Sequence, residues 1–330
     1  MKDSYHIFSD GCLKRKDNTI SFVSDEDGVR RDIPIERVSD IYVMSEISLN
    51  VSLLNILSKY GVNVHFFNYY GHYIGSYYPK EKLISGNLHV RQAEHYSDPE
   101  KRLVLAQAFI LAGAENIYRN LRYYNPRKNV GGYIDEIKFL ISKINKTSSV
   151  DELMGIEGNI RKLYYESWNF IVNQKIDFVK RVKNPPDNMI NSLISFVNSL
   201  MYARVLSEIY HTQLDPSISF LHEPGVRRFS LSLDVSEVFK PLLCDRLIFS
   251  LLNRNQITEK SFTKGLNCLH LTKDAQRLIC QEFDKKMRTT IMHKELRRNI
   301  SYQDLIRLDM YKLVKHLLGE KEYSGFTIWW

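Results

Sequence analysis

The sequence has 330 residues, of which 44% are hydrophobic and 25% are charged, and this composition excludes a predominantly disordered chain. Lysine and arginine outnumber aspartate and glutamate by 46 to 38, so the formal net charge is +8 and the pI is near 9.1. This excess is typical of a protein that binds a polyanion, although many basic proteins bind no nucleic acid. The length favours two domains over one.

The cysteines and the apolar segments indicate the cellular compartment of the protein. Four cysteines are scattered without any CxxC pair, which argues against a zinc ribbon or a redox dithiol and favours buried, reduced thiols. The first residues lack the apolar core of a signal peptide, and no uninterrupted apolar stretch reaches the ~18 residues of a membrane span. We therefore expect a cytoplasmic protein that does not enter a membrane.

Residues 1–80 carry a β pattern. Short segments rich in β-branched and aromatic residues alternate with turn formers, namely YHIF, TISFVS, RRDIPI, SDIYVM, VNVHFF and HYIGSYY. Residues 52–60, SLLNILSKY, interrupt this rhythm with apolar residues at helical spacing. The pattern predicts a small, mostly antiparallel β domain with one helix beside it.

Beyond residue 80 the pattern changes to a helical one. Periodicity fades and charge rises over residues 81–92, which we interpret as a linker. From residue 93 to 330 apolar residues recur at intervals of three and four, which predicts a larger all-α domain. The expected fold class is therefore α+β. The sequence has no fixed-period repeat and no glycine-rich phosphate loop, so neither a solenoid nor an ATP or NAD site is predicted.

Glu157 is the first candidate for chemistry. It lies in GIEGNIRKLYY (155–165), with a glycine close on each side, and we place it at the entry of a helix. Glycines allow a ligand to approach the backbone closely. Taken alone, a glutamate in this position is most often a helix-start carboxylate that the helix dipole favours, so the functional interpretation of Glu157 needs partners elsewhere in the sequence.

A second segment supplies partners for Glu157. Residues 220–241 read FLHEPGVRRFSLSLDVSEVFKP, in which His222 precedes a Pro-Gly turn and an apolar run that begins a helix. Asp234 and Glu237 lie three residues apart, so on a helix both carboxylates share one face. We expect them to converge on one ion.

Two or three carboxylates and one imidazole form a site suited to Mg²⁺ or Mn²⁺ with open water positions. Such an ion polarises a phosphodiester and orients an attacking oxygen, so the matching chemistry is phosphoryl transfer. Each residue also has an ordinary interpretation, since His222 can be a hydrogen-bonded loop histidine and Asp234 a helix cap.

DNA contacts are predicted around these candidates. Arg227 and Arg228 are either surface charges or bidentate ligands of a phosphate near the metal. Tyr164 and Tyr165 follow Glu157 in a basic and aromatic stretch, and we add them to the predicted DNA-binding residues.

Three segments together carry a family resemblance. They are GIEGNIRKLYY (155–165), FVKRVKNPPDNMINSLISFVNSLMY (178–202) and FLHEPGVRRFSLSLDVSEVFKPLLCDR (220–246). In order and spacing they resemble the CRISPR-associated spacer-acquisition endonuclease and integrase family, and the β-rich start followed by a linker resembles its N-terminal half. The resemblance extends over essentially the whole chain.

The resemblance implies a function and a ligand set. It implies that Glu157, His222 and Glu237 bind one divalent metal, either Mg²⁺ or Mn²⁺, with Asp234 as a candidate fourth ligand. The implied reaction is attack of a 3′ hydroxyl of incoming DNA on a phosphodiester at the edge of a CRISPR repeat. The implied partners are double-stranded DNA (prespacer and repeat), a second copy of the chain joined through the β domains, and a small ferredoxin-like adaptation protein.

Two alternatives remain open at this point. One is an unrelated metal-dependent nuclease that degrades DNA without joining it. The other is a helical DNA-binding scaffold in which Glu157, His222 and Glu237 are structural. Strand joining on repeat-containing DNA distinguishes the first alternative, and loss of metal binding in Glu157→Ala with retained DNA affinity would argue against the second.

Overall fold

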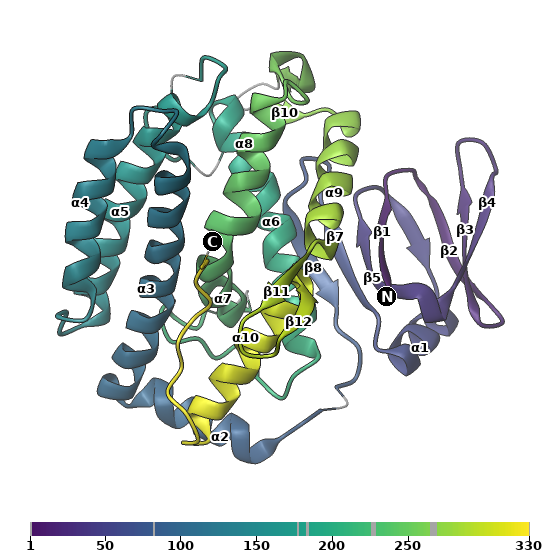
Figure 1. Ribbon diagram of the computed structural model, residues 1–330. Coiled ribbons are helices and arrows are strands. Elements are labelled where there is room, and N and C mark those ends of the chain that lie inside the picture. Colours follow the sequence, from purple (N-terminus) through teal and green to yellow (C-terminus); the bar gives the residue numbers. More distant parts are fainter. Residues whose placement is uncertain are drawn as a thin grey trace.

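The computed structural model describes residues 2–81, 83–176, 178–182, 185–225, 229–264 and 269–329. It consists of an N-terminal lobe of two sheets (residues 2–81) and a helical lobe (residues 83–329), which lie side by side (Figure 1). The mixed α/β architecture, with β structure first and helices after it, follows the order expected from the change of periodicity.

The N-terminal lobe contains two four-stranded sheets. Their strands are β1 (Asp3–Ile7), β2 (Gly11–Lys16), β3 (Thr19–Ser24), β4 (Arg30–Pro34), β5 (Val38–Val43), β6 (Ile47–Leu49), β7 (Asn63–Phe67) and β8 (Tyr73–Tyr77). One sheet has the order β1-β5-β7-β8 and the other has the order β4-β3-β2-β6.

The strand directions correct the expectation of a mostly antiparallel domain. In the first sheet β1, β5 and β7 are parallel and only β8 is antiparallel. In the second sheet β2, β3 and β4 are antiparallel, whereas β6 runs parallel to β2. Alternating apolar residues show which face of a strand is buried, but they do not reveal the direction of its neighbour. The sheets are therefore mixed.

The predicted helix in the N-terminal lobe is confirmed as α1 (Val51–Tyr60). The Asn50 side chain caps it by accepting from the Leu53 N–H at 3.0 Å, and it ends at Gly61, which has a left-handed φ of 67°. The helix and strands enclose a separate apolar core that consists of Leu13, Ile20, Ile35, Val38, Ile41, Val43, Leu53, Ile56, Leu57, Val62 and Val64.

The helical lobe is built from helices of very different lengths. They are α2 (Gly86–Ser97), α3 (Pro99–Tyr124), α4 (Gly131–Ile144), α5 (Val150–Ile171), α6 (Met189–Tyr210), α7 (Ser230–Lys240), α8 (Arg246–Asn253), α9 (Lys273–Arg288) and α10 (Tyr302–Leu317). A π-helical turn, Pro241–Asp245, joins α7 to α8. Because α2 begins at Gly86, part of the predicted linker 81–92 is helical.

This lobe is not purely helical, which corrects the expectation of an all-α domain. It contains two antiparallel strand pairs, β9 (Phe262–Lys264) with β10 (Leu269–Leu271) and β11 (Thr290–His293) with β12 (Arg298–Ser301). Strands of three or four residues are too short for alternation to be distinguished from helical spacing.

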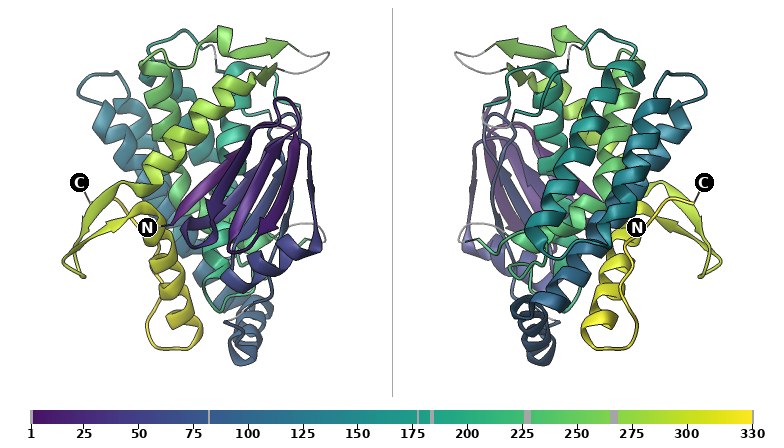
Figure 2. Two further views of the ribbon diagram at one scale, coloured as in Figure 1. Left: turned by 90° about the vertical axis from the view of Figure 1, so that its right-hand side faces the viewer. Right: turned by 90° about the vertical axis from the view of Figure 1, so that its left-hand side faces the viewer.

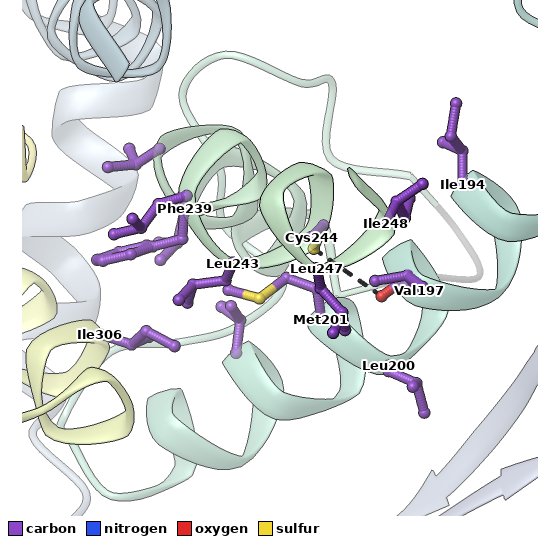
Figure 3. Packing of buried hydrophobic residues seen from close by; sticks show 14 of the residues in the cluster. Ile194, Val197, Leu200, Met201, Phe239, Leu243, Cys244, Leu247, Ile248 and Ile306 are labelled. Atoms are coloured by element: carbon purple, nitrogen blue, oxygen red, sulfur yellow. Dashed lines mark hydrogen bonds between the residues drawn. The ribbon is translucent and has the colours of Figure 1, made fainter. Parts of the chain in front are cut away.

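Helix α6 runs through the core of the helical lobe. It is long and apolar enough to cross a membrane by length and composition, but most of its residues are buried by neighbouring helices. Figure 3 shows Cys244 next to Val197 of α6, with its sulfur 4.0 Å from the Val197 carbonyl oxygen. We therefore interpret α6 as the core helix of a globular protein.

The two lobes meet across a polar, buried interface. Arg204 of α6 donates to Asp40 of β5 at 2.7 Å, and both side chains are almost completely buried. His65 of β7 contacts Ser76 Oγ through Nδ1 at 2.6 Å and Ser207 Oγ of α6 through Nε2 at 2.7 Å. Figure 2 shows the sheets covering one side of the helices. Whether the lobes fold as independent domains stays a prediction.

The segment after α10 returns along α3 toward α7 (Figure 1). Asn116 of α3 donates through Nδ2 to the carbonyl oxygens of Val238 at 2.8 Å and Phe326 at 2.9 Å, and its Oδ1 accepts from the Ile328 N–H at 2.8 Å. One buried amide therefore joins α3, α7 and the last described residues.

Candidate metal centre

Glu157 lies in the interior of α5 rather than at its entry. The helix begins at Val150, after the Ser149 side chain, which accepts from the Glu152 N–H at 3.2 Å. Ser149 and the first-turn acids provided a stronger start signal than the glycine next to Glu157. The Glu157 side chain is 22% exposed, so its carboxylate reaches solvent from the middle of a rigid helix.

Glu237 is positioned by the contact between α3 and α7. An added Cβ at Gly113 of α3 would lie 2.8 Å from the Glu237 carbonyl oxygen, a distance that side chains do not tolerate. Glycine therefore allows α7 to approach α3 this closely. The Glu237 side chain is 12% exposed and faces α5.

A single guanidinium joins the two glutamates. Arg161, one turn after Glu157 on α5, donates through Nε to Glu157 Oε1 at 3.1 Å and through Nη2 to Glu237 Oε2. The other oxygen of Glu237 accepts from Lys240 Nζ. The carboxylates of α5 and α7 thus converge on one position, and a cation of the protein itself lies there.

Glu237 and Arg161 shift each other's pKa values. Burial alone would raise the pKa of Glu237, but the positive charges of Lys240 and Arg161 outweigh burial and hold this pKa far below its usual range. Burial would lower the pKa of Arg161, and the negative charge of Glu237 more than compensates and raises it. Both groups are therefore ionised throughout the neutral range.

His222 lies in the loop before α7 and is oriented by Asp234. Its Nδ1 lies 2.8 Å from Asp234 Oδ1, which leaves Nε2 available to an external partner. Asp234 is fully buried and also accepts from the backbone N–H groups of Phe220, Leu221 and His222, at 2.7, 2.9 and 3.0 Å. A carboxylate behind an imidazole fixes the ring and its tautomer, an arrangement common behind metal-binding histidines.

This geometry corrects the expectation that Asp234 and Glu237 converge on one ion. Both oxygens of Asp234 are used by the loop and by His222, whereas Glu237 points to Arg161 and Lys240. A spacing of three residues gives only approximate alignment on a helix. Asp234 is a residue that positions His222.

The donor set fits a hard divalent ion. In the ranges that the structure describes, no three His, Cys, Asp or Glu side chains are close enough to hold a metal as they stand. Two carboxylates nevertheless share one guanidinium, which marks a cation position, and His222 presents a free imidazole nitrogen. Oxygen ligands with one imidazole suit Mg²⁺ or Mn²⁺, so Glu157, Glu237 and His222 are the side chains that would hold the ion.

The structure places the predicted DNA-binding tyrosines in different environments and does not describe the two arginines. Tyr164 is fully buried, and its hydroxyl accepts from Asn120 Nδ2 at 3.1 Å, so it is a core residue without a surface for DNA. Tyr165 is half-buried and packs against Trp168 edge to face, and a DNA contact there stays a prediction. Arg227 and Arg228 lie outside the described residues.

Sequence reasoning missed three residues of this centre, namely Arg161, Lys240 and Asp245. Arg161 follows Glu157 by four residues and Lys240 follows Glu237 by three, which are the spacings of helical ion pairs and were a usable signal. Asp245 gave no such signal, because its charge comes near Arg161 only through the π-helical turn after α7.

Comparisons with known proteins place the chain in a family. The family model described as CRISPR associated protein Cas1 matches residues 5–285. The CRISPR-associated endonuclease Cas1 of Fusobacterium nucleatum is 60% identical over 100% of this chain and 98% of its own length. CRISPR-associated endonuclease Cas1 3 of Thermodesulfovibrio yellowstonii is 46% identical over 99% of both chains.

Solved structures agree with this placement. A Cas1 protein from Thermotoga maritima superposes with a TM-score of 0.89 at 41% identity and covers 98% of this chain and 99% of that chain. A casposase bound to its integration product shares the fold, with a TM-score of 0.87 at 22% identity over 99% of this chain and 93% of that chain. With a family model across most of its length and relatives similar from end to end, the chain belongs to the CRISPR-associated Cas1 family.

Proposed function

We propose that the protein is a divalent-metal-dependent DNA endonuclease and integrase that inserts short DNA fragments into a CRISPR array. The observation that carries this proposal is the convergence of Glu157 and Glu237 on one cation position, together with a histidine in the loop before α7 that Asp234 holds in a fixed orientation. The names of its relatives, CRISPR-associated endonucleases, support the nuclease part.

Glu157, Glu237 and His222 would hold Mg²⁺ or Mn²⁺, which when bound supplies charge stabilisation for a phosphodiester under attack. In the proposed integration step a 3′ hydroxyl oxygen of the incoming fragment forms a bond to a repeat-edge phosphorus. The bond from that phosphorus to the 3′ oxygen of the repeat strand breaks, and the proton of the attacking hydroxyl ends on the departing oxygen by way of solvent. The number of phosphodiesters is unchanged, and water in place of the hydroxyl gives hydrolysis.

The proposed partners are double-stranded DNA, a second copy of the chain and a small ferredoxin-like adaptation protein. The net charge of +8 supports DNA as the polyanion. Among neighbours of the same fold, one is a casposase described as bound to an integration product, and another belongs to a complex described as Cas6-RT-Cas1–Cas2, at 14% identity. These descriptions motivate the partner proposal.

The test is strand transfer of a short duplex with free 3′ hydroxyls into a repeat-containing plasmid, with Mn²⁺ or Mg²⁺. Glu157→Gln, His222→Ala and Glu237→Gln should each abolish joined product, because each removes one proposed ligand. Glu136→Gln, which changes an exposed glutamate of α4, is the matched control and should join DNA as the wild type does.

The alternatives separate in the same experiment. Cleavage without joining, also after the small adaptation protein is added, would support a nuclease without integrase activity. If wild type and Glu157→Gln both bind DNA but neither binds Mn²⁺, the result would support a DNA-binding scaffold.

A further inference from the structure

Arg161 occupies the position at which a metal would join Glu157 to Glu237. Its guanidinium contacts one oxygen of each glutamate, and its side chain is only 13% exposed. A metal ion that takes both carboxylates as ligands cannot share this position with a guanidinium. Binding of the ion therefore requires Arg161 to leave, and an arginine that leaves needs another partner, since an unpaired buried charge is costly.

Asp245 is placed to be that partner. It lies in the π-helical turn after α7 and is 3% exposed. Its Oδ2 is buried and has no hydrogen-bond partner in the structure. Burial raises the pKa of Asp245 to about 7, and the positive charges of Arg161 and Lys240 offset this only in part. The buried oxygen without a partner is therefore an acceptor that a displaced guanidinium can use.

We propose that Arg161 is a built-in occupant of the metal position, which a divalent ion displaces and which Asp245 then receives. The inference rests on the proposed function, since it assumes that Glu157 and Glu237 bind the ion. In this arrangement the charge of the centre stays balanced without metal. A monovalent ion gains too little from two carboxylates to replace a guanidinium, so Arg161 also favours divalent ions.

The experiment measures Mn²⁺ binding to the full chain without DNA, from the EPR signal of free Mn²⁺. Arg161→Gln should bind Mn²⁺ about ten-fold more tightly than wild type, because the ion no longer has to displace a guanidinium from Glu157 and Glu237. Asp245→Asn should bind it about ten-fold more weakly, because the expelled Arg161 loses its acceptor. The double variant should match Arg161→Gln, since Asp245 acts only through Arg161.

Thermal unfolding in EDTA gives a second readout that needs no activity. Arg161→Gln should melt at a lower temperature than wild type in EDTA, since Glu157 and Glu237 then lose their common cation, and it should gain more from added Mn²⁺. Lys162→Gln removes the neighbouring, exposed charge of α5 and is the matched control for both readouts.

The outcomes distinguish this inference from the proposed function. If wild type binds Mn²⁺ and joins DNA but Arg161→Gln binds Mn²⁺ equally or more weakly, Arg161 does not compete with the ion and only the present inference is overturned. If Lys240→Gln tightens binding and Arg161→Gln does not, the ion displaces Lys240 and the inference is overturned as well. If neither wild type nor Arg161→Gln binds Mn²⁺, both proposals fail.

Discussion

At the residue scale, the orientation of His222 depends on one buried carboxylate. Asp234 accepts three backbone N–H groups and the imidazole, so it orders the loop and the ring together. The loop is also held from outside, because Glu223 pairs with Arg102 at 2.6 Å and Arg102 Nε donates to the Phe220 carbonyl. Two independent sets of contacts thus keep His222 beside α7.

The first prediction concerns Asp234→Asn. An amide cannot accept hydrogen bonds at both atoms, so the variant should lose about 2 kcal/mol of unfolding free energy. It should also bind Mn²⁺ roughly 10- to 100-fold more weakly, which is the usual loss when the carboxylate behind a metal-binding histidine is removed. Denaturant unfolding and Mn²⁺ titration measure the two effects. Asp274→Asn, at an exposed aspartate of α9, is the control and should leave Mn²⁺ affinity unchanged. Unaltered affinity in Asp234→Asn would mean that His222 needs no carboxylate behind it.

At the element scale, the centre is set by how closely α3 approaches α7. Gly113 leaves no room for a methyl group against the backbone of Glu237. The position of one proposed ligand is therefore fixed by a residue that itself supplies no side-chain ligand.

Gly113→Ala is the second prediction. The added Cβ should force the helices apart at a cost of about 1–3 kcal/mol of unfolding free energy, and it should weaken Mn²⁺ binding because Glu237 moves with α7. Gly132→Ala on α4 is the control, since an added Cβ there meets nothing within 4 Å and helix propensity favours alanine. If Gly113→Ala kept wild-type stability and affinity, the α3–α7 contact would be shown to adjust freely.

The interface between β7 and α6 gives a prediction of pH dependence. Burial lowers the pKa of His65 from 6.5 to about 4, so the native protein keeps this histidine neutral where the unfolded chain protonates it. The contribution of neutral His65 to the unfolding free energy should therefore be fully present above pH 6.5. It should fall by about 1.4 kcal/mol per pH unit as the pH drops toward 4. His6 and His211, with pKa values lowered to about 3 and about 4, act in the same direction.

Denaturant unfolding at several pH values between 4 and 6.5 tests this. His65→Gln should be less stable overall but show a shallower pH slope, whereas His293→Gln on the β11–β12 hairpin should keep the wild-type slope. Equal slopes in wild type and His65→Gln would mean that His65 is protonated in the native state.

At the scale of the whole molecule, the basic charge should appear in DNA binding. We expect the affinity for duplex DNA to fall steeply with salt, because phosphate contacts release counterions. Binding titrations over a range of NaCl concentrations measure the slope. A flat response would indicate that the net charge of +8 takes no part in binding.

The sequence predicted the parts of the fold that depend on local periodicity, such as α1 and the change from strands to helices. It did not predict that β1, β5 and β7 are parallel, since strand direction depends on connections made through intervening elements. For the candidate metal centre, the sequence predicted the types of ligand, but it did not predict the guanidinium between Glu157 and Glu237. That contact exists only because α5 packs near α7, over a distance in sequence that no pattern spans.

The joint at Asn116 has a consequence for the order of assembly during synthesis. Because this amide holds the backbone of Val238, next to Glu237, together with Phe326 and Ile328, α7 reaches its final position only after almost all of the described chain has been made. A nascent chain still in the ribosome exit tunnel lacks that joint. We therefore expect ribosome-stalled chains in which Phe326 and Ile328 remain in the tunnel to bind Mn²⁺ more weakly than stalled chains from which both residues have emerged.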